Sequence, residues 1–72
     1  MVEVFKTNVT ERCHANMIIE RIHHTYTNYN ANFDLEDCDR ILRIKCMSGN
    51  ISPTCMIDLL KNLGFYAEVL TE

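Results

Sequence analysis

The stretch from Asn32 to Met47, NFDLEDCDRILRIKCM, decides the fold that this sequence predicts. It holds two short runs in which apolar and polar residues alternate, with the apolar members Phe33, Leu35, Leu42 and Ile44. Alternation with a period of two residues is typical of a strand with one buried and one exposed face. The acidic corner between the runs is difficult to bury and favours a chain reversal. The stretch therefore predicts an antiparallel hairpin at the centre of the chain.

Residues 1–7, MVEVFKT, are rich in β-branched and aromatic side chains and predict a first strand. The direction of its side chains stays open, because Val2 and Val4 alternate with Phe5. Either Phe5 lies on the open face of the sheet, or a bulge near Lys6 changes the register. The strand is predicted in both cases, and only its buried side differs.

The segment after this strand predicts a helix that ends at about Thr25. Thr10 is its expected N-cap, and Glu11 in the first turn suits the positive end of a helix. Apolar residues recur at spacings of three and four, as on one buried helix face, and they are Ala15, Ile18, Ile19, Ile22 and Tyr26. Residues 25–30, TYTNYN, are poor helix formers and are expected to form the turn that follows.

Ser52 and Pro53 predict the start of a second helix, because Ser caps a helix well and Pro fits its first position. The apolar stripe of this helix consists of Met56, Leu59, Leu60 and Leu63. Gly64 is the expected left-handed residue just past its end. Residues 65–71, FYAEVLT, alternate again and predict a last strand.

The predicted order is therefore βαββαβ. Because each βαβ half crosses over with a right hand, both helices fall on one face of the sheet. The sequence predicts one α+β domain over residues 1–72, a ferredoxin-like sandwich of four antiparallel strands and two helices. The other sheet face stays open to water or to a partner, and we expect it to carry Asp34, Glu36, Ile41, Arg43, Lys45, Tyr66, Glu68 and Leu70. That face is either a solvated surface of mixed charge or an apolar strip that supports self-association.

Composition narrows the classes of function. Of 72 residues, 47% are hydrophobic and 24% are charged, which indicates one small folded domain. The net charge of −3 argues against general binding of nucleic acid or of anionic lipid. No apolar run approaches the roughly 20 residues that span a bilayer, and residues 1–20 lack a signal-peptide pattern. The four cysteines are then expected to be reduced, and the expected location is the cytoplasm.

Residues 59–70, LLKNLGFYAEVL, resemble the second helix, the Gly–aromatic junction and the last strand of the heavy-metal-associated domain. This family is the small module of copper chaperones and metal-pumping ATPases. The central ILRI, the length and the order of elements agree with it as well. The resemblance implies the same fold and, in the family, a soft-metal site made by Met-x-Cys-x-x-Cys in the loop after the first strand.

The metal-binding motif of that family is absent from this chain. Two thiolates hold Cu(I) in the family, but the corresponding loop here reads NVTERCH. If Val9 takes the Met position, the two Cys positions fall on Glu11 and His14. If the register shifts by one residue, they fall on Thr10 and Cys13. Neither register supplies two thiolates, so the copper chemistry implied by the resemblance does not carry over.

Substitute ligands are the alternative. Zn²⁺ accepts the side chains of Glu11, Cys13 and His14, but a stable zinc site uses about four ligands, and adjacent helical residues diverge by about 100°. We therefore expect no cofactor, with Cu(I) or Zn²⁺ at these three residues as the alternative. Phe65 is expected near the same loop, as the aromatic of the family is. The resulting interaction surface is predicted to consist of Asn8, Val9, Thr10 and Phe65.

The other reactive side chains are weaker candidates for a functional site. Cys38 lies between Asp37 and Asp39, and this acidic corner is interpreted as a solvated turn because it lacks the ligand spacing of a calcium loop. His23 and His24 are adjacent and are expected to point apart. The sequence contains no phosphate-binding Gly-rich loop and no nucleophile elbow, so we expect no enzymatic activity.

The leading hypothesis is a small non-enzymatic binding module without the paired thiolates of the family it resembles. A protein partner is expected, with no nucleic acid and no membrane. The chain itself is expected to be a monomer or a weak homodimer through the open sheet face. The alternatives are a copper or zinc chaperone with substitute ligands and a self-associating regulatory domain.

Overall fold

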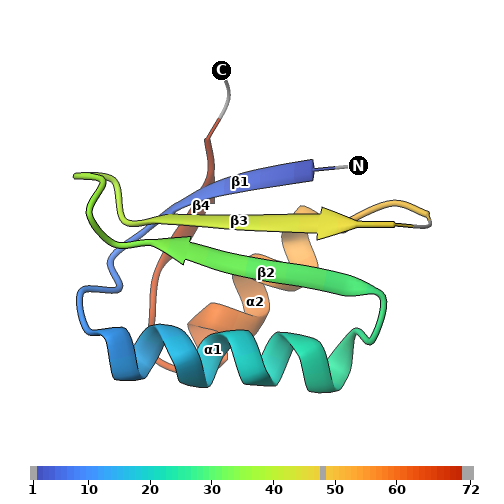
Figure 1. Cartoon of the computed structure of the whole chain (residues 1–72), viewed down its shortest axis with the longest axis horizontal. Coiled ribbons are helices and arrows are strands. Elements are labelled where there is room, and N and C mark those ends of the chain that lie inside the picture. Colours follow the sequence, from blue (N-terminus) through green and yellow to red (C-terminus); the bar gives the residue numbers. More distant parts are fainter. Residues whose placement is uncertain (1, 48, 71–72) are drawn as a thin grey trace.

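The computed structural model describes residues 2–47 and 49–70, and its elements follow the predicted order βαββαβ (Figure 1). The strands and helices are β1 (Val2–Thr7), α1 (Arg12–Thr25), β2 (Tyr29–Asp34), β3 (Ile41–Cys46), α2 (Pro53–Asn62) and β4 (Ala67–Val69). The predicted hairpin at the centre of the chain is formed by β2 and β3.

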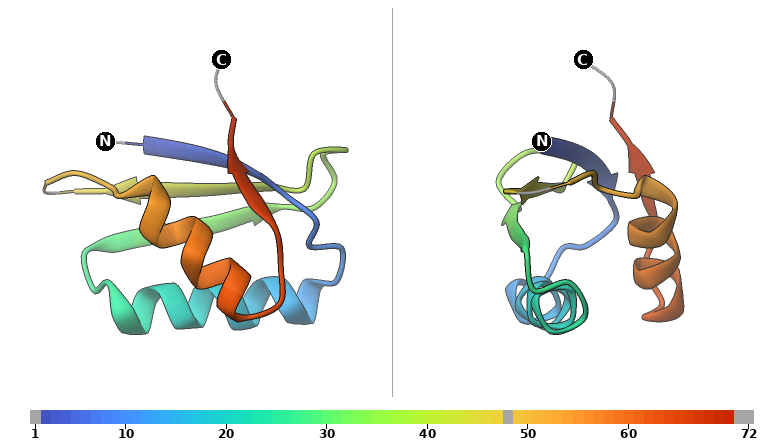
Figure 2. Two further views of the ribbon diagram at one scale, coloured as in Figure 1. Left: turned by 180° about the vertical axis from the view of Figure 1, so that it is seen from behind. Right: turned by 90° about the vertical axis from the view of Figure 1, so that its right-hand side faces the viewer.

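The four strands form one antiparallel sheet in the order β2-β3-β1-β4. Both helices lie on one side of it, with α1 below β2 and α2 beside β4 (Figure 2). The α+β, ferredoxin-like fold predicted from the sequence is therefore confirmed. On the side of the sheet away from the helices, Val2, Arg43 and Lys45 are exposed, whereas Ile41, next to the hairpin corner, is buried.

The register of β1 corrects the sequence prediction. Phe5 lies opposite Leu42 on β3 and Val69 on β4, and its side chain is fully buried in the core. From Val2 to Phe5 the pairs with β3 keep one register, so Val2 and Val4 alternate onto the open face. The predicted placement of Phe5 on the open face is wrong. Beyond Phe5 the pairing with β3 shifts by one residue, since the N–H of Thr7 donates to the oxygen of Asp39 and not to that of Arg40. A strand buries only one of its two alternating sets, and here the set with the aromatic ring of Phe5 is buried, together with Thr7.

Three boundaries also differ from the prediction. The N-cap of α1 is Glu11 and not Thr10, and no side chain caps this end. The strand β2 begins at Tyr29, inside the segment predicted as a turn, because Tyr29 pairs with Cys46 and its ring stacks on Tyr26 with 4.8 Å between ring centroids. The last strand is shorter than predicted, and residues 71–72 lie outside the described part.

The signals at the ends of α2 are confirmed. The hydroxyl of Ser52 accepts a hydrogen bond from the backbone N–H of Cys55 at 3.5 Å, and Pro53 is the first helical residue. Gly64 has φ = 91°, the left-handed conformation that a residue with a Cβ adopts only under strain. These two signals set the length of α2 and direct the chain into β4.

One buried residue, Thr7, joins two loops to the end of β1. Thr7 is buried, and its hydroxyl donates to the backbone oxygen of Arg40 at 2.6 Å. The same hydroxyl oxygen accepts from the backbone N–H of Val9 at 3.2 Å, and the N–H of Thr7 donates to the oxygen of Asp39 at 3.1 Å. The hairpin corner and the loop before α1 are therefore both fixed to the end of β1.

The buried direction of Phe5 leads to a stability prediction. Phe5→Ala should lower the free energy of unfolding by about 3–5 kcal/mol, because it removes a ring from a closed core. Val2→Ala is the control on the same strand and should change it by less than about 0.5 kcal/mol, since Val2 is 50% exposed. Urea unfolding monitored by circular dichroism measures both. If Phe5→Ala is too unstable to fold, Phe5→Leu gives the smaller loss. Equal effects of Phe5→Leu and Val2→Ala would contradict the register.

Candidate functional site

The uncovered face of the sheet is the largest candidate surface. The pairing register places on it Val2, Val4 and Lys6 from β1, Asn30, Asn32 and Asp34 from β2, Ile41, Arg43 and Lys45 from β3, and Tyr66, Glu68 and Leu70 from the last strand and its flanks. The sequence predicted most of the charged members, and the structure adds the two valines in place of Phe5. Glu36 lies in the hairpin corner, outside the strands.

Apolar side chains run across the middle of this face. Val2 is half exposed, and Val4 and Leu70 are partly exposed. The backbone N–H of Leu70 donates to the oxygen of Val4 at 2.9 Å, so the last strand brings Leu70 alongside β1. We call Val2, Val4 and Leu70 the apolar strip. No described helix covers it, so its surface is available to a partner (Figure 2).

The cations on this face differ in their surroundings. Lys6 lies 3.8 Å from the carboxylate of Asp39 and opposite Glu68 on β4. Arg43 and Lys45, which we call the basic pair, have neutral residues directly opposite them: Val4 and Asn32 for Arg43, and Val2 and Asn30 for Lys45. Asp34 is the diagonal neighbour of Arg43 on β2. Within residues 2–47 and 49–70, neither member of the basic pair has an ion-pair partner.

The loop where the resemblance places a metal serves mainly to hold the fold. Val9 is fully buried, so its side chain does not contribute to the predicted interaction surface. The side-chain oxygen of Asn8 accepts from the backbone N–H of Tyr66 at 2.8 Å, and the N–H of Asn8 donates to the oxygen of Tyr66 at 3.4 Å. Thr10 is exposed. The loop is thus held by the burial of Val9 in the core and by the hydrogen bonds of Asn8 to Tyr66, the residue just before β4.

The three predicted ligands are exposed around the start of α1. Glu11 is its N-cap, and Cys13 and His14 lie in its first turn. Phe65 lies against this turn as predicted, with 5.3 Å between the ring centroids of His14 and Phe65. In the described part of the chain, these three residues are not among the groups whose ligand atoms all lie within 4.8 Å of one another. A shared ion would require their side chains to move.

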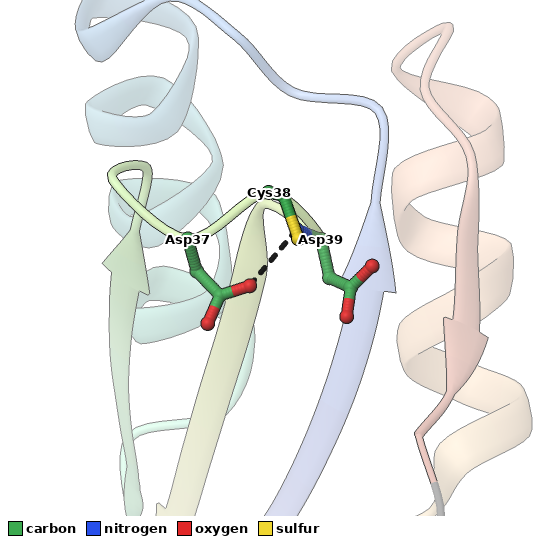
Figure 3. A group of neighbouring side chains, drawn as sticks. All are labelled: Asp37, Cys38 and Asp39. Carbon is green, nitrogen blue, oxygen red and sulfur yellow. Dashed lines mark hydrogen bonds between the residues drawn. The ribbon is translucent and has the colours of Figure 1, made fainter.

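The acidic corner is the group that meets this distance criterion, with the ligand atoms of Asp37, Cys38 and Asp39 within 4.8 Å of one another (Figure 3). The geometry is that of a tight turn. The carboxylate of Asp37 accepts from the backbone N–H of Asp39 at 2.9 Å, and Arg40 has a positive φ of 49°. The guanidinium of Arg40 donates to the oxygen of Leu35 at 2.7 Å. These contacts close the hairpin, in agreement with its interpretation as a turn.

A groove of about 480 Å³ lies between the two helices. Its lining includes Arg21 and Tyr26 from the α1 side and Cys55, Asp58 and Leu59 from α2. Burial, and then the hydrogen bond to Cys55, raise the pKa of the Tyr26 hydroxyl above its usual value. The sequence did not predict this groove, because it depends on how far apart the sheet holds the two helices.

A histidine side chain covers part of the edge strand β2. The Nε2 atom of His23 accepts from the backbone N–H of Ala31 at 3.1 Å. His23 and the neighbouring His24 are both exposed, and both line one surface pocket with Met17, Glu20 and Arg21. That the two side chains point apart stays a prediction. The contact satisfies a backbone donor that an edge strand otherwise leaves to water or to another chain. This contact could not be predicted from the sequence, apart from the short connection between the end of α1 and β2.

A scan of protein-family models, a search of curated proteins and a search of solved structures each found no significant match to this chain. The resemblance to the heavy-metal-associated domain therefore stays a prediction. None of the helices in residues 2–47 and 49–70 is long and apolar enough to cross a membrane.

The contact of His23 with β2 makes a testable prediction. His23→Ala should lower the free energy of unfolding by about 1 kcal/mol, because it removes the acceptor of one backbone N–H. His24→Ala is a matched control, since it removes the same side chain one residue further along α1, where it is exposed. Urea midpoints at pH 7.5, together with amide hydrogen exchange at Ala31, measure the difference. Unchanged exchange at Ala31 in His23→Ala would contradict the contact.

Proposed function

We propose that this chain is a small non-enzymatic module that binds another protein through its open sheet face. The observation that carries the proposal is the apolar strip of Val2, Val4 and Leu70, which no described helix covers. It lies beside the basic pair, so apolar contact and charge recognition are available on one flat surface. Because this fold serves many activities, the proposal rests on the surface and not on the topology.

The partner class follows from the composition of the surface. An interface with an apolar centre and a charged rim is typical of protein recognition. The net charge of −3 opposes a general role in binding nucleic acid or anionic membranes. The described cysteines form no disulfide, with Cys13, Cys38 and Cys55 exposed and Cys46 buried, which suits a reducing compartment such as the cytoplasm.

The same surface supports weak association of the chain with itself. A stable interface buries about 800 Å² on each partner, and most of that area here would be polar or charged. The proposal is therefore a monomer, or a weak homodimer, that binds a different protein as its main partner.

Disrupting the apolar strip tests this function. Val4→Glu places a charge in its centre and should abolish capture of the partners that the wild-type chain retains, while the far-ultraviolet spectrum stays unchanged. Met17→Glu is the matched control, because Met17 is an exposed apolar residue on the outer side of α1. Quantitative affinity capture from the source cells, followed by binding measurements with each purified partner, gives the readout. Equal capture by Val4→Glu and wild type would contradict the proposal.

A metal chaperone with substitute ligands is the second candidate. Cys13 and His14 favour it, because both are metal-ligating side chains that are exposed in the first turn of α1. Glu11 is the nearest carboxylate to them in the sequence. The ligand atoms of these residues are not gathered as in a preformed metal site, so the metal chaperone is the weaker of the two candidate functions.

Titration of the reduced protein with Cu(I) and then Zn²⁺, in the presence of a competing chelator, separates the two candidates. We expect only weak and scattered amide shifts, because the ligand atoms of Glu11, Cys13 and His14 do not form a compact group. Saturable shifts confined to Asn8, the three ligands and Phe65 would instead support the metal chaperone. Cys13→Ser would then abolish them, whereas Cys55→Ser, at another exposed helix-start thiol, would leave them unchanged.

A further inference from the structure

We infer that the partner of the open face is an acidic, amphipathic protein segment that binds Arg43 and Lys45 with carboxylates and the apolar strip with apolar side chains. The inference rests on the proposed function, because it names the chemistry of the partner for the same surface. The inference rests on the distribution of charge over the sheet, which is locally positive although the net charge of the chain is negative.

The open face is positive although the chain is negative. The full sequence has seven Lys and Arg residues and ten Asp and Glu residues. The open face carries three of those cations and two of those anions, which are Lys6, Arg43, Lys45, Asp34 and Glu68. The strand residues of this face thus carry +1 and the remainder of the sequence −4, but Asp39 of the hairpin corner lies 3.8 Å from Lys6 and offsets that cation. The positive charge that attracts a partner is therefore that of Arg43 and Lys45. An acidic partner is therefore attracted to this face and repelled from the rest of the molecule.

The positive charge is concentrated at one end of the sheet. Lys6 is compensated by Asp39 at 3.8 Å and by Glu68 on the adjacent strand. The basic pair lies further along β3, away from the acidic hairpin corner, and the residues directly opposite it are neutral. Alternate residues of a strand lie about 7 Å apart along one face, so two like charges repel there until an anion binds.

This spacing fits an extended acidic segment. Carboxylates at alternate positions of an extended chain recur at the same interval of about 7 Å. A segment that lies along β3 can thus place one carboxylate at Arg43 and the next at Lys45. Val4 lies directly opposite Arg43, and Leu70 lies beside Val4. Apolar side chains of the same segment would then cover the apolar strip and exclude water from the ion pairs, which strengthens them.

A second copy of the chain fits this face less well. In a two-fold pair with the axis along the strands, β2 of one copy lies over β4 of the other, which brings Asp34 over Glu68. If the axis instead runs across the strands, through the cross-strand row that contains Val4, Arg43 and Asn32, Arg43 of one copy lies over Arg43 of the other. Both arrangements bring like charges together, which disfavours association.

A nucleic acid fits this face less well too. Single-stranded bases stack on aromatic side chains of a sheet, and the open-face residues of the two central strands include no aromatic ring. Tyr66 lies at the β4 edge, where its hydroxyl donates to Glu68 at 2.9 Å. Phosphates would also meet the carboxylates of Asp34 and Glu68.

A displayed library of random 12-residue peptides, selected on the folded wild-type chain, tests the inference with a defined probe. We expect the enriched peptides to combine Asp or Glu at alternate positions with apolar residues. The strongest peptide, synthesised and titrated into the labelled chain, should shift amides of β1, β3 and Leu70. Its affinity should fall at least tenfold between 50 mM and 500 mM NaCl, because exposed ion pairs are screened.

Charge reversal supplies the decisive comparison. The double variant Arg43→Glu, Lys45→Glu should weaken binding of that peptide at least tenfold. The double variant Arg12→Glu, Lys61→Glu makes the same change of charge at exposed residues on the helix side and should leave binding within twofold of wild type. Loss in both variants would show that net charge alone attracts the peptide, and this result would overturn the inference.

The remaining outcomes separate this inference from the proposed function. Neutral or basic peptides that bind the open face would overturn the acidic partner and leave the protein-binding function intact. Peptides that shift only residues elsewhere, or a library without enriched peptides, would overturn both. A concentration-dependent dimer in sedimentation that is lost in the Arg43→Glu, Lys45→Glu variant would assign the face to a second copy. Tighter binding of a 12-nucleotide oligoribonucleotide to the same amides would assign it to nucleic acid.

Discussion

The inward direction of Phe5 determines the character of both faces of the sheet. Because side chains alternate along a strand, burying Phe5 against Leu42 sends Val2 and Val4 to the opposite face. A strand that buried the valines would have left the aromatic ring in water. The chain therefore gains a closed interior and, as a direct consequence, keeps apolar side chains on a face that no described helix covers. Val2 and Val4 of the candidate interaction surface are thus exposed because Phe5 is buried in the core.

The same alternation fixes the loop before α1. Thr7 follows Phe5 by two residues, so it is also buried, and its hydroxyl bonds to both Arg40 and Val9. Val9 then enters the core, and Asn8 pairs with Tyr66. In the family that the sequence resembles, this region holds the metal. Here its backbone and buried side chains are engaged in holding β1, the hairpin corner and β4 together.

Much of the fold was predictable because the strongest signals are local. The alternation in β3, the Ser52–Pro53 start and the Gly64 stop each depend on a few neighbouring residues. The facing of β1 was not predictable, since two valines and one phenylalanine compete for a single buried side and the outcome depends on the partners across the strands. The start of β2 at Tyr29 was missed for a related reason: its polar neighbours read as a turn, while pairing with β3 extends the strand.

The candidate site was predictable only in part, because it depends on which strands are neighbours. The sequence placed Arg43 and Lys45 on the open face, but it could not show that one lies opposite Val4 and the other opposite Val2. Nor could it show that Asp39 comes close to Lys6, which leaves the positive charge at the far end of β3. An acidic segment that approaches this face meets attraction at that end and repulsion at the hairpin corner. Because attraction and repulsion act at opposite ends of one strand, the charge pattern selects the orientation of the segment as well as its composition.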